Sequence, residues 1–159
     1  MNYCKVIGAV LLLLSGVLVA GRLNKIAAEA LRQAEAWESL TEEIKRRVES
    51  FSLPISDILE ECGSPLLFRC GYTQSALPRD LSEMVKHTCF YDAELANIAE
   101  RFALEFGYED RDAQTERCKY FASLISEKRK GLGDALPEKR KLNLTVSLSI
   151  CLGLLIFFI

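Results

Sequence analysis

The residues whose types could support chemistry gather between Phe106 and Cys118, in the stretch FGYEDRDAQTERC. A glycine, several carboxylates and an arginine follow one another there. Paired carboxylates can act as general acid and base, and clustered carboxylates can bind a divalent cation. The same residue types also serve the ends of helices. The rest of the sequence must therefore decide between a catalytic site, a metal loop and a helix junction.

A catalytic or metal-binding role would need partners elsewhere in the sequence. The chain contains no H-E-x-x-H, Walker A, G-x-S-x-G or EF-hand motif. Its six cysteines include no C-x-x-C pair and its single histidine is His87, so the usual ligand sets of a zinc site are missing. We therefore expect no enzymatic activity, no metal and no cofactor. We expect the cysteines to be reduced and buried as small apolar side chains.

A helix junction accounts for the same residues. Gly107 stands where one helix would end in a left-handed residue, and Asp110 stands where the next would begin. Asp112 adds a negative charge to the first turn of that next helix, which the helix dipole favours. The sequence predicts that Gly107 ends one helix and that Asp110 lies at or beside the start of the next.

Gln114 belongs to the same stretch but is less easily explained. It shares one helical face with the apolar residues Cys118, Phe121 and Ile125. An amide on that face would point into the protein and would need hydrogen-bond partners there. We predict that Gln114 is largely buried with its amide satisfied. The predicted structural junction then consists of Gly107, Asp110, Arg111 and Gln114.

A long amphipathic helix is predicted over the stretch from Leu23 to Phe51, which has neither proline nor glycine. Apolar residues recur at seven-residue intervals, at Leu23, Ala30, Trp37, Ile44 and Phe51. The heptad pattern could form a dimeric coiled coil, or the apolar face could pack within the domain. Because the seam is rich in alanine and breaks at Thr41, the pattern favours packing within the domain.

Two short helices are predicted next. Ser52 caps the first, with Pro54 in its first turn, and Gly63 ends it. The second restarts at Pro65 and closes at Gly71.

Three more helices complete the central region. One opens at Asp80 and continues to Lys86, and another opens at Asp92. The last extends from about Arg111 towards Ala135. No stretch alternates convincingly as a strand. The sequence predicts an all-α fold, an antiparallel bundle of about six helices.

Both ends of the chain are apolar and uncharged. The segments 6–21 and 142–159 approach the ~17–20 residues that a helix needs to cross a bilayer, and we predict a transmembrane helix at each end. A cleavable signal peptide is the alternative for the first segment, but a cut after Ala20 would place the large Leu18 at position −3. The predicted domains are the N-terminal span 1–21, the helical domain 22–141 and the C-terminal span 142–159.

Basic residues border the two spans on the side of the central domain. They are Arg22, Lys25, Lys139, Arg140 and Lys141, whereas the outer flanks hold only Lys5. By the positive-inside rule the central domain faces the cytoplasm and both termini lie outside. The central region is mildly acidic, so we expect no nucleic-acid binding.

The chain resembles the stage III sporulation protein AB family of endospore-forming bacteria. The resemblance covers nearly the whole chain and includes KVIGAVLLLLSGVLVAGRL near the start, SLPISDILEECG after the first long helix, and FGYEDRDAQ. The pattern of Gly107, Asp110, Arg111 and Gln114 is its most specific feature.

The resemblance implies a role in the channel-like complex between mother cell and forespore. The protein would lie in the mother-cell membrane facing the forespore. Its domain would be similar to the cytoplasmic domains of the platform proteins of type II secretion and type IV pilus machines. The implied partners are an ATPase like stage III sporulation protein AA and other membrane subunits of the complex.

A docking surface for such an ATPase should be exposed and polar, with a few apolar or arginine anchors. The interface candidates from the sequence are Lys45, Arg46, Arg47, Arg111 and Arg117. Two alternatives remain for the function: a homodimeric coiled-coil membrane scaffold and a membrane-tethered enzyme.

Overall fold

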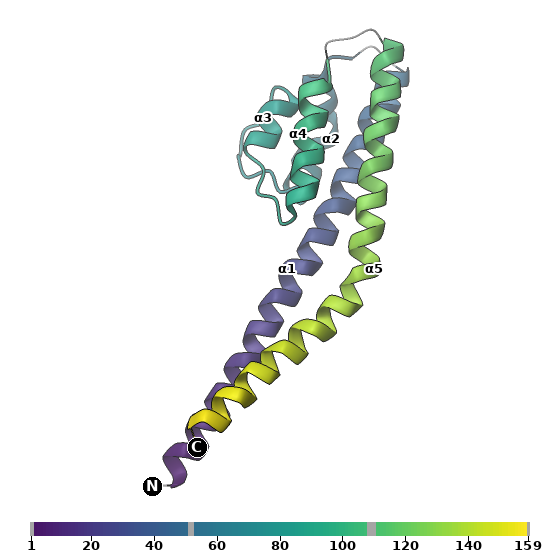
Figure 1. Ribbon diagram of the computed structural model, residues 1–159. Helices are drawn as coiled ribbons and strands as arrows, with labels where there is room; N and C mark the ends of the chain where they lie inside the picture. Colours follow the sequence, from purple (N-terminus) through teal and green to yellow (C-terminus); the bar gives the residue numbers. More distant parts are fainter. Residues whose placement is uncertain (1, 51–52, 108–110, 159) are drawn as a thin grey trace. The chain divides into compact units, whose positions relative to one another are not determined.

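The computed structural model describes residues 2–50, 53–107 and 111–158. These residues form helices and contain no strand. The helices are α1 (Asn2–Ser50), α2 (Ile55–Arg69), α3 (Leu81–Lys86), α4 (Ala93–Glu105) and α5 (Arg111–Phe158) (Figure 1). The chain divides into two compact units, which we call the apolar unit (Met1–Glu29 with Gly133–Ile159) and the core unit (Ala30–Leu132). The predicted all-helical class is confirmed.

The first helix joins two elements that the sequence suggested. α1 is helical without interruption from the N-terminal apolar segment into the heptad segment. Among the described residues, one helix is long and apolar enough to cross a membrane, namely α1 from Val10 to Ser50. In its second half, the heptad residues Ala30, Trp37 and Ile44 are buried within the core unit. The predicted packing of this face within the domain is confirmed.

The short helices follow their local signals with one change. Gly63 has a φ of 75° and a ψ of 155°, which are not helical angles, so α2 consists of two helices that meet at a kink at this glycine, where the sequence predicted the break. Pro54 is the N-cap of α2 and not a residue of its first turn. Gly71, with a φ of 97°, follows the C-cap Cys70 as expected. The predicted cap Ser52 lies outside the described residues.

Aspartate caps open the next two helices, as predicted. A carboxylate oxygen of Asp80 accepts a hydrogen bond of 2.7 Å from the backbone N–H of Glu83 at the start of α3. Asp92 does the same for α4, with a bond of 2.9 Å from the N–H of Leu95. Each side chain satisfies an amide that the first turn of a helix leaves without an internal partner.

The last helix differs from the prediction. It does not end near Ala135 but continues through Pro137 to Phe158. Gly131 and Gly133 keep negative φ angles, so neither forms a left-handed helix end. Pro137 lacks the N–H that would bond to the carbonyl of Gly133, yet a helix can lose that single bond and continue. The described residues therefore form five helical elements, of which α2 is kinked at Gly63, and the C-terminal apolar segment continues the last predicted helix of the domain.

Aromatic side chains from three helices fill the centre of the core unit. Trp37, Phe102 and Phe121 are fully buried. The ring centroids of Phe102 and Phe121 are 5.1 Å apart, and those of Trp37 and Phe90 are 5.7 Å apart. Burying rings of this size is the largest contribution that single side chains make to such a core. Phe102 of α4 thus packs on Phe121 of α5, and Trp37 of α1 packs on Phe90, which precedes α4.

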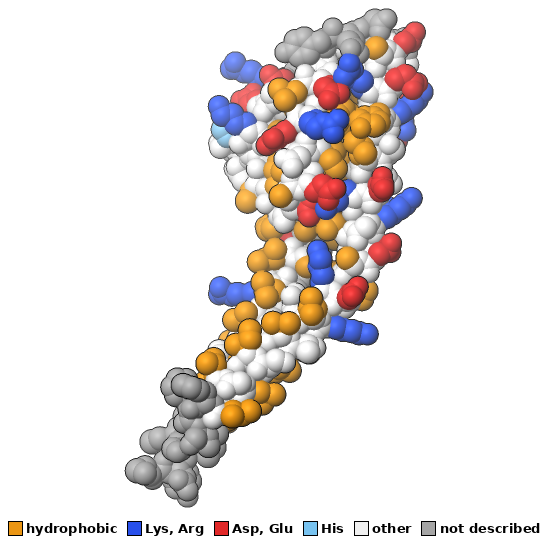
Figure 2. Space-filling model, viewed as in Figure 1, with side chains coloured by type: hydrophobic (Ala, Val, Ile, Leu, Met, Phe, Trp, Pro, Cys, Tyr) orange, Lys and Arg blue, Asp and Glu red, His pale blue; other side chains and the backbone are white. Residues whose placement is uncertain are grey.

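In the apolar unit, α1 and α5 pack against each other in antiparallel directions. Asn143 Nδ2 donates a 2.9 Å hydrogen bond to Asn24 Oδ1, and Cys151 Sγ lies 3.3 Å from the carbonyl oxygen of Leu12. A Cβ on Gly16 would lie 2.5 Å from Cys151 Sγ and 3.3 Å from the carbonyl oxygen of Ser147, so a larger residue would force the thiol to move. The outer surface is apolar, with most large side chains exposed (Figure 2).

Candidate functional site

The helix junction that the sequence singled out is only partly as predicted. Gly107 follows the end of α4 with a φ of 99°, which suits a residue that closes a helix. The predicted cap Asp110 lies outside the described residues, as does the side chain of Arg111. The side chain of Gln114 is half-buried, and the expected satisfaction of its amide stays a prediction. Gln114 lies in the first turn of α5, whereas Cys118 and Phe121, further along the same face, are fully buried.

A different glutamine provides the buried polar contact. Gln33, on α1, is only 2% exposed. Its Nε2 donates hydrogen bonds of 2.8 Å to the carbonyl of Cys70 and 2.7 Å to the carbonyl of Cys89. Its Oε1 accepts a bond of 2.9 Å from the N–H of Tyr91. One side chain thus connects α1 to the segment after α2 and to the segment before α4.

Two neighbours of Gln33 complete this polar node. Trp37 Nε1 donates a 3.0 Å hydrogen bond to the carbonyl of Cys70. At Gly71, a Cβ would lie 2.3 Å from Gln33 Nε2 and 2.6 Å from the carbonyl oxygen of Cys89, and the φ of 97° also favours glycine. The node is structural, since every polar atom that it buries is bonded within the domain. The sequence held a signal for it, because Gln33 is a polar residue four positions before Trp37 on the buried face.

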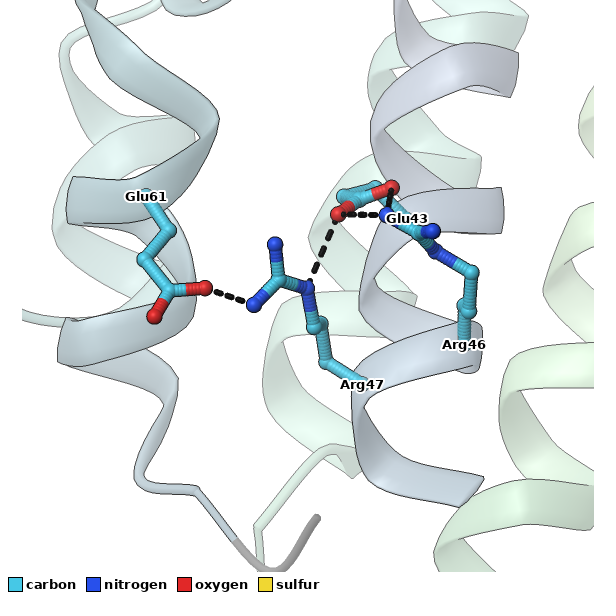
Figure 3. Close-up of polar contacts among 4 residues, drawn as sticks. All are labelled: Glu43, Arg46, Arg47 and Glu61. Carbon is cyan, nitrogen blue, oxygen red and sulfur yellow. Dashed lines mark hydrogen bonds and ion pairs between the residues drawn. The ribbon is translucent and has the colours of Figure 1, made fainter. Parts of the chain in front are cut away.

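The basic run on α1 is paired with acids of the same domain. Arg46 Nη2 lies 2.6 Å from Glu43 Oε1, and Arg47 Nε lies 2.9 Å from the same oxygen (Figure 3). Arg47 also pairs with Glu61 of α2. Lys45 pairs with Glu42 at 2.6 Å. Hydrogen bonds from Arg46, and less so from Arg47, lower the pKa of Glu43 against the opposing effect of burial.

These pairs narrow the set of interface candidates. The side chain of Arg46 is 66% exposed, whereas Lys45 and Arg47 expose 25% and 26%. Arg117 pairs with Glu105 at 2.7 Å, between α5 and α4. Arg46 is therefore the member of the run that is most accessible to a partner.

Two cysteines of the core unit are suited to packing and not to nucleophilic attack. Cys70 and Cys118 are fully buried. Burial raises the pKa of both thiols, that of Cys118 to about 12. A thiol with so high a pKa carries almost no thiolate at neutral pH. Cys89 is exposed, so the expectation that the cysteines are buried fails at this position.

A groove between α3 and α4 is a further accessible feature of the core unit. It has a volume of about 450 Å³ and is lined by Ser82, Val85, Lys86, Thr88, Phe90, Glu100, Ala103 and Leu104. Leu104 is 71% exposed, so a large apolar side chain is accessible at the groove. The lining combines apolar side chains with one lysine and one glutamate. Among the described residues, no group of three metal-ligating side chains is found here or elsewhere.

Comparison with known protein families, curated proteins and solved structures gives no match to this chain. Its function must therefore be argued from its own residues and fold.

Proposed function

We propose that this protein is a membrane-anchored, non-enzymatic platform subunit. In this proposal it belongs to the complex between mother cell and forespore that endospore formation requires. Its helical domain lies in the cytoplasm and couples an ATPase like stage III sporulation protein AA to the membrane subunits. The family resemblance described above supplies the identity of the complex and of the partners.

The observation that carries the proposal is the uninterrupted helix α1. Its first half exposes large apolar side chains, among them Leu11, Leu14 and Leu18, at 55–70% of their surface. Its second half contributes the buried Trp37 and Leu40 to the domain core. A helix that is exposed and apolar at one end and part of a folded core at the other is what a membrane anchor of a soluble domain requires.

The C-terminal half of α5 supports a second span. Among the described residues, α1 and not α5 is found long and apolar enough to cross a membrane. The second span is therefore proposed and not observed. Its large apolar side chains are nevertheless exposed, with Leu142 at 60%, Ile150 at 58% and Ile156 at 81%. Towards α1 it presents the buried Ser147 and Cys151. Small side chains at the contact and large ones outside are typical of helices that pack in a bilayer.

We propose the α3–α4 groove as the surface that receives the ATPase. The basic run at 45–47 is less suitable because acids of the same domain already pair with it. The groove instead offers the exposed Leu104 and the half-buried Phe90 as apolar anchors. Lys86 and Glu100 at the groove supply charges that fix orientation.

Neither alternative function gains support from a particular contact. The heptad face that a coiled-coil dimer would use is buried in the core of a single chain. A tethered enzyme would need a nucleophile and a base that converge. The hydroxyls in the groove belong to Ser82 and Thr88, and Thr88 Oγ1 donates to the carbonyl of Met84 at 2.7 Å.

Co-purification of the full chain, in detergent, with the ATPase of the stage III sporulation complex tests the proposal. We expect the ATPase to be retained and Leu104→Asp to reduce its retention about tenfold or more, as the loss of a central anchor would. The matched control is Leu77→Asp, which changes a side chain that is 41% exposed and outside the groove. No retention of the ATPase, alone or with the other subunits, would contradict the platform proposal. Equal losses for both variants would contradict the choice of groove.

A further inference from the structure

The two units differ in the share of their basic side chains that acids neutralise. In the core unit most described basic residues are paired, the exceptions being Arg69, Arg79, Lys86 and Lys130. In the core unit, ion pairs with carboxylates engage Lys45, Arg46, Arg47, Arg101, Arg117, Lys119, Lys128 and Arg129. In the apolar unit, the side chains of Arg22, Lys25, Lys139, Arg140 and Lys141 are exposed. Within the part of the chain that the structure describes, none of these five forms an ion pair. We call these five residues the basic collar.

The collar residues lie at a similar level along the two packed helices. The hydrogen bond between Asn24 and Asn143 fixes the register of α1 against α5 in this unit. Arg22 and Lys25 are within two residues of Asn24, and Lys139 is four residues from Asn143. With a rise of about 1.5 Å per residue, each lies within roughly 6 Å of that hydrogen bond along its helix. The charges are therefore concentrated in one band.

The band adjoins exposed apolar surface. Leu23, Ile26 and Leu142 alternate in sequence with the collar residues and are exposed by 44%, 50% and 60%. Figure 2 shows basic side chains at the border of the hydrophobic surface that α1 and α5 form. The nearest acid in sequence is Glu138, on the side away from the apolar segment. Cations next to an apolar surface match the two parts of a phospholipid, its phosphate and its acyl chains.

We infer that the basic collar binds the phosphate groups of anionic phospholipids. Arginine can donate two parallel hydrogen bonds to a phosphate, and lysine adds a mobile point charge. The collar lies, in sequence, between the apolar segments and the core unit, so it would meet the headgroups of the leaflet on the domain side. The inference rests on the membrane-spanning part of the proposed function. It adds to that function a preference of the subunit for anionic phospholipids around it.

The test uses the full chain reconstituted into vesicles of phosphatidylcholine, with and without phosphatidylglycerol. Flotation after an alkaline wash first reports whether the protein is integrated into the bilayer. The protein is then extracted in mild detergent, and the lipid that remains bound is quantified by mass spectrometry. We expect flotation with both vesicle types and, from the mixed vesicles, a several-fold enrichment of bound phosphatidylglycerol over its bulk fraction. The enrichment should decrease as salt is raised.

Variants identify the residues responsible. The triple substitution Lys139→Gln, Arg140→Gln and Lys141→Gln should remove most of the enrichment, and adding Arg22→Gln and Lys25→Gln should abolish it. A charge-matched control replaces Arg69, Arg79 and Lys130 by Gln; all three are exposed residues of the core unit outside the α3–α4 groove. The control should keep the wild-type enrichment. Substituting Lys139 and Lys141 by Arg should keep it too, which separates loss of charge from loss of folding.

The outcomes distinguish this inference from the proposal beneath it. Failure to float with either vesicle type would overturn both the membrane anchor and the collar. Flotation without enrichment, or an equal loss in the control variant, would overturn the collar alone. Displacement of bound phosphatidylglycerol by inorganic phosphate would show that a free anion is the ligand and would also overturn the lipid assignment.

Discussion

The core unit and the apolar unit place the same types of side chain in different environments. In the core unit, apolar residues such as Trp37 are buried and basic residues such as Arg129 pair with acids, here Glu38 at 2.6 Å. In the apolar unit, large apolar residues are exposed and basic residues have no acidic partner among the described residues. Most apolar and basic side chains of the core unit thus have partners within that unit. The apolar unit lacks partners that a bilayer and its headgroups would supply.

The largest expected effect separates the two halves of α1. Trp37→Ala removes a fully buried ring and its hydrogen bond to the carbonyl of Cys70, and should cost about 3–5 kcal/mol of unfolding free energy. Leu18→Ala, in the same helix, changes a side chain that is 70% exposed and should stay within about 0.5 kcal/mol. Denaturant unfolding of the full chain in mild detergent measures both. Similar losses for the two variants would show that the contrast along α1 is wrong.

A smaller effect distinguishes the two glutamines. Gln33→Ala leaves the carbonyls of Cys70 and Cys89 short of donors and should destabilise the domain by about 2 kcal/mol. Gln114→Ala, at a half-buried position, should cost less than about 1 kcal/mol. The same unfolding experiment compares them. A larger loss of unfolding free energy for Gln114→Ala than for Gln33→Ala would contradict the structural role of the node at Gln33.

The smallest effect concerns the cap of α4 and depends on pH. Burial alone would raise the pKa of Asp92, but the hydrogen bond from the N–H of Leu95 and the pair with Lys128 outweigh it and lower that pKa. A folded-state pKa below the unfolded value means that the stabilisation is present above about pH 4 and is lost as pH falls through the folded value. Asp92→Ala should cost about 1 kcal/mol at neutral pH.

Thermal melts of this variant across pH provide the check. The difference in stability between wild type and Asp92→Ala should shrink as the solution is acidified below about pH 4. Asp134→Ala, at an exposed position, is the control and should change little at any pH. A difference that grows on acidification would have the wrong sign for the assigned contacts.

Local signals in the sequence predicted much of the core unit. The caps Asp80 and Asp92 and the turn glycines Gly71 and Gly107 occupy the expected positions, because each acts through its own backbone and its immediate neighbours. The C-terminal end of α5 was harder to predict. α5 passes through Pro137 since nothing beyond that residue ends the helix.

The polar node shows the limit of a single helical pattern. Gln33 lies on an apolar face of α1, and periodicity alone does not say which backbone carbonyls it meets. Those carbonyls belong to Cys70 and Cys89, more than thirty residues away in sequence. The ion pairs of the basic run at 45–47 also include a long-range contact, because Glu61 of α2 pairs with Arg47 of α1. Long-range contacts of this kind decided which sequence candidates remained accessible.

The central claim, a cytoplasmic domain anchored in a membrane, is tested most directly by the accessibility of two cysteines in intact cells. Cys89 is exposed and Cys70 is fully buried. Trypsin cleavage after Arg69, Arg79, Lys86 and Arg101 places them in separate peptides, so mass spectrometry can score each one in the wild-type chain.

We predict that a membrane-impermeant maleimide labels neither cysteine in intact cells, labels Cys89 once the membrane is permeabilised, and labels Cys70 only after unfolding. Labelling of Cys89 in intact cells would place the domain outside the cytoplasm and contradict the account.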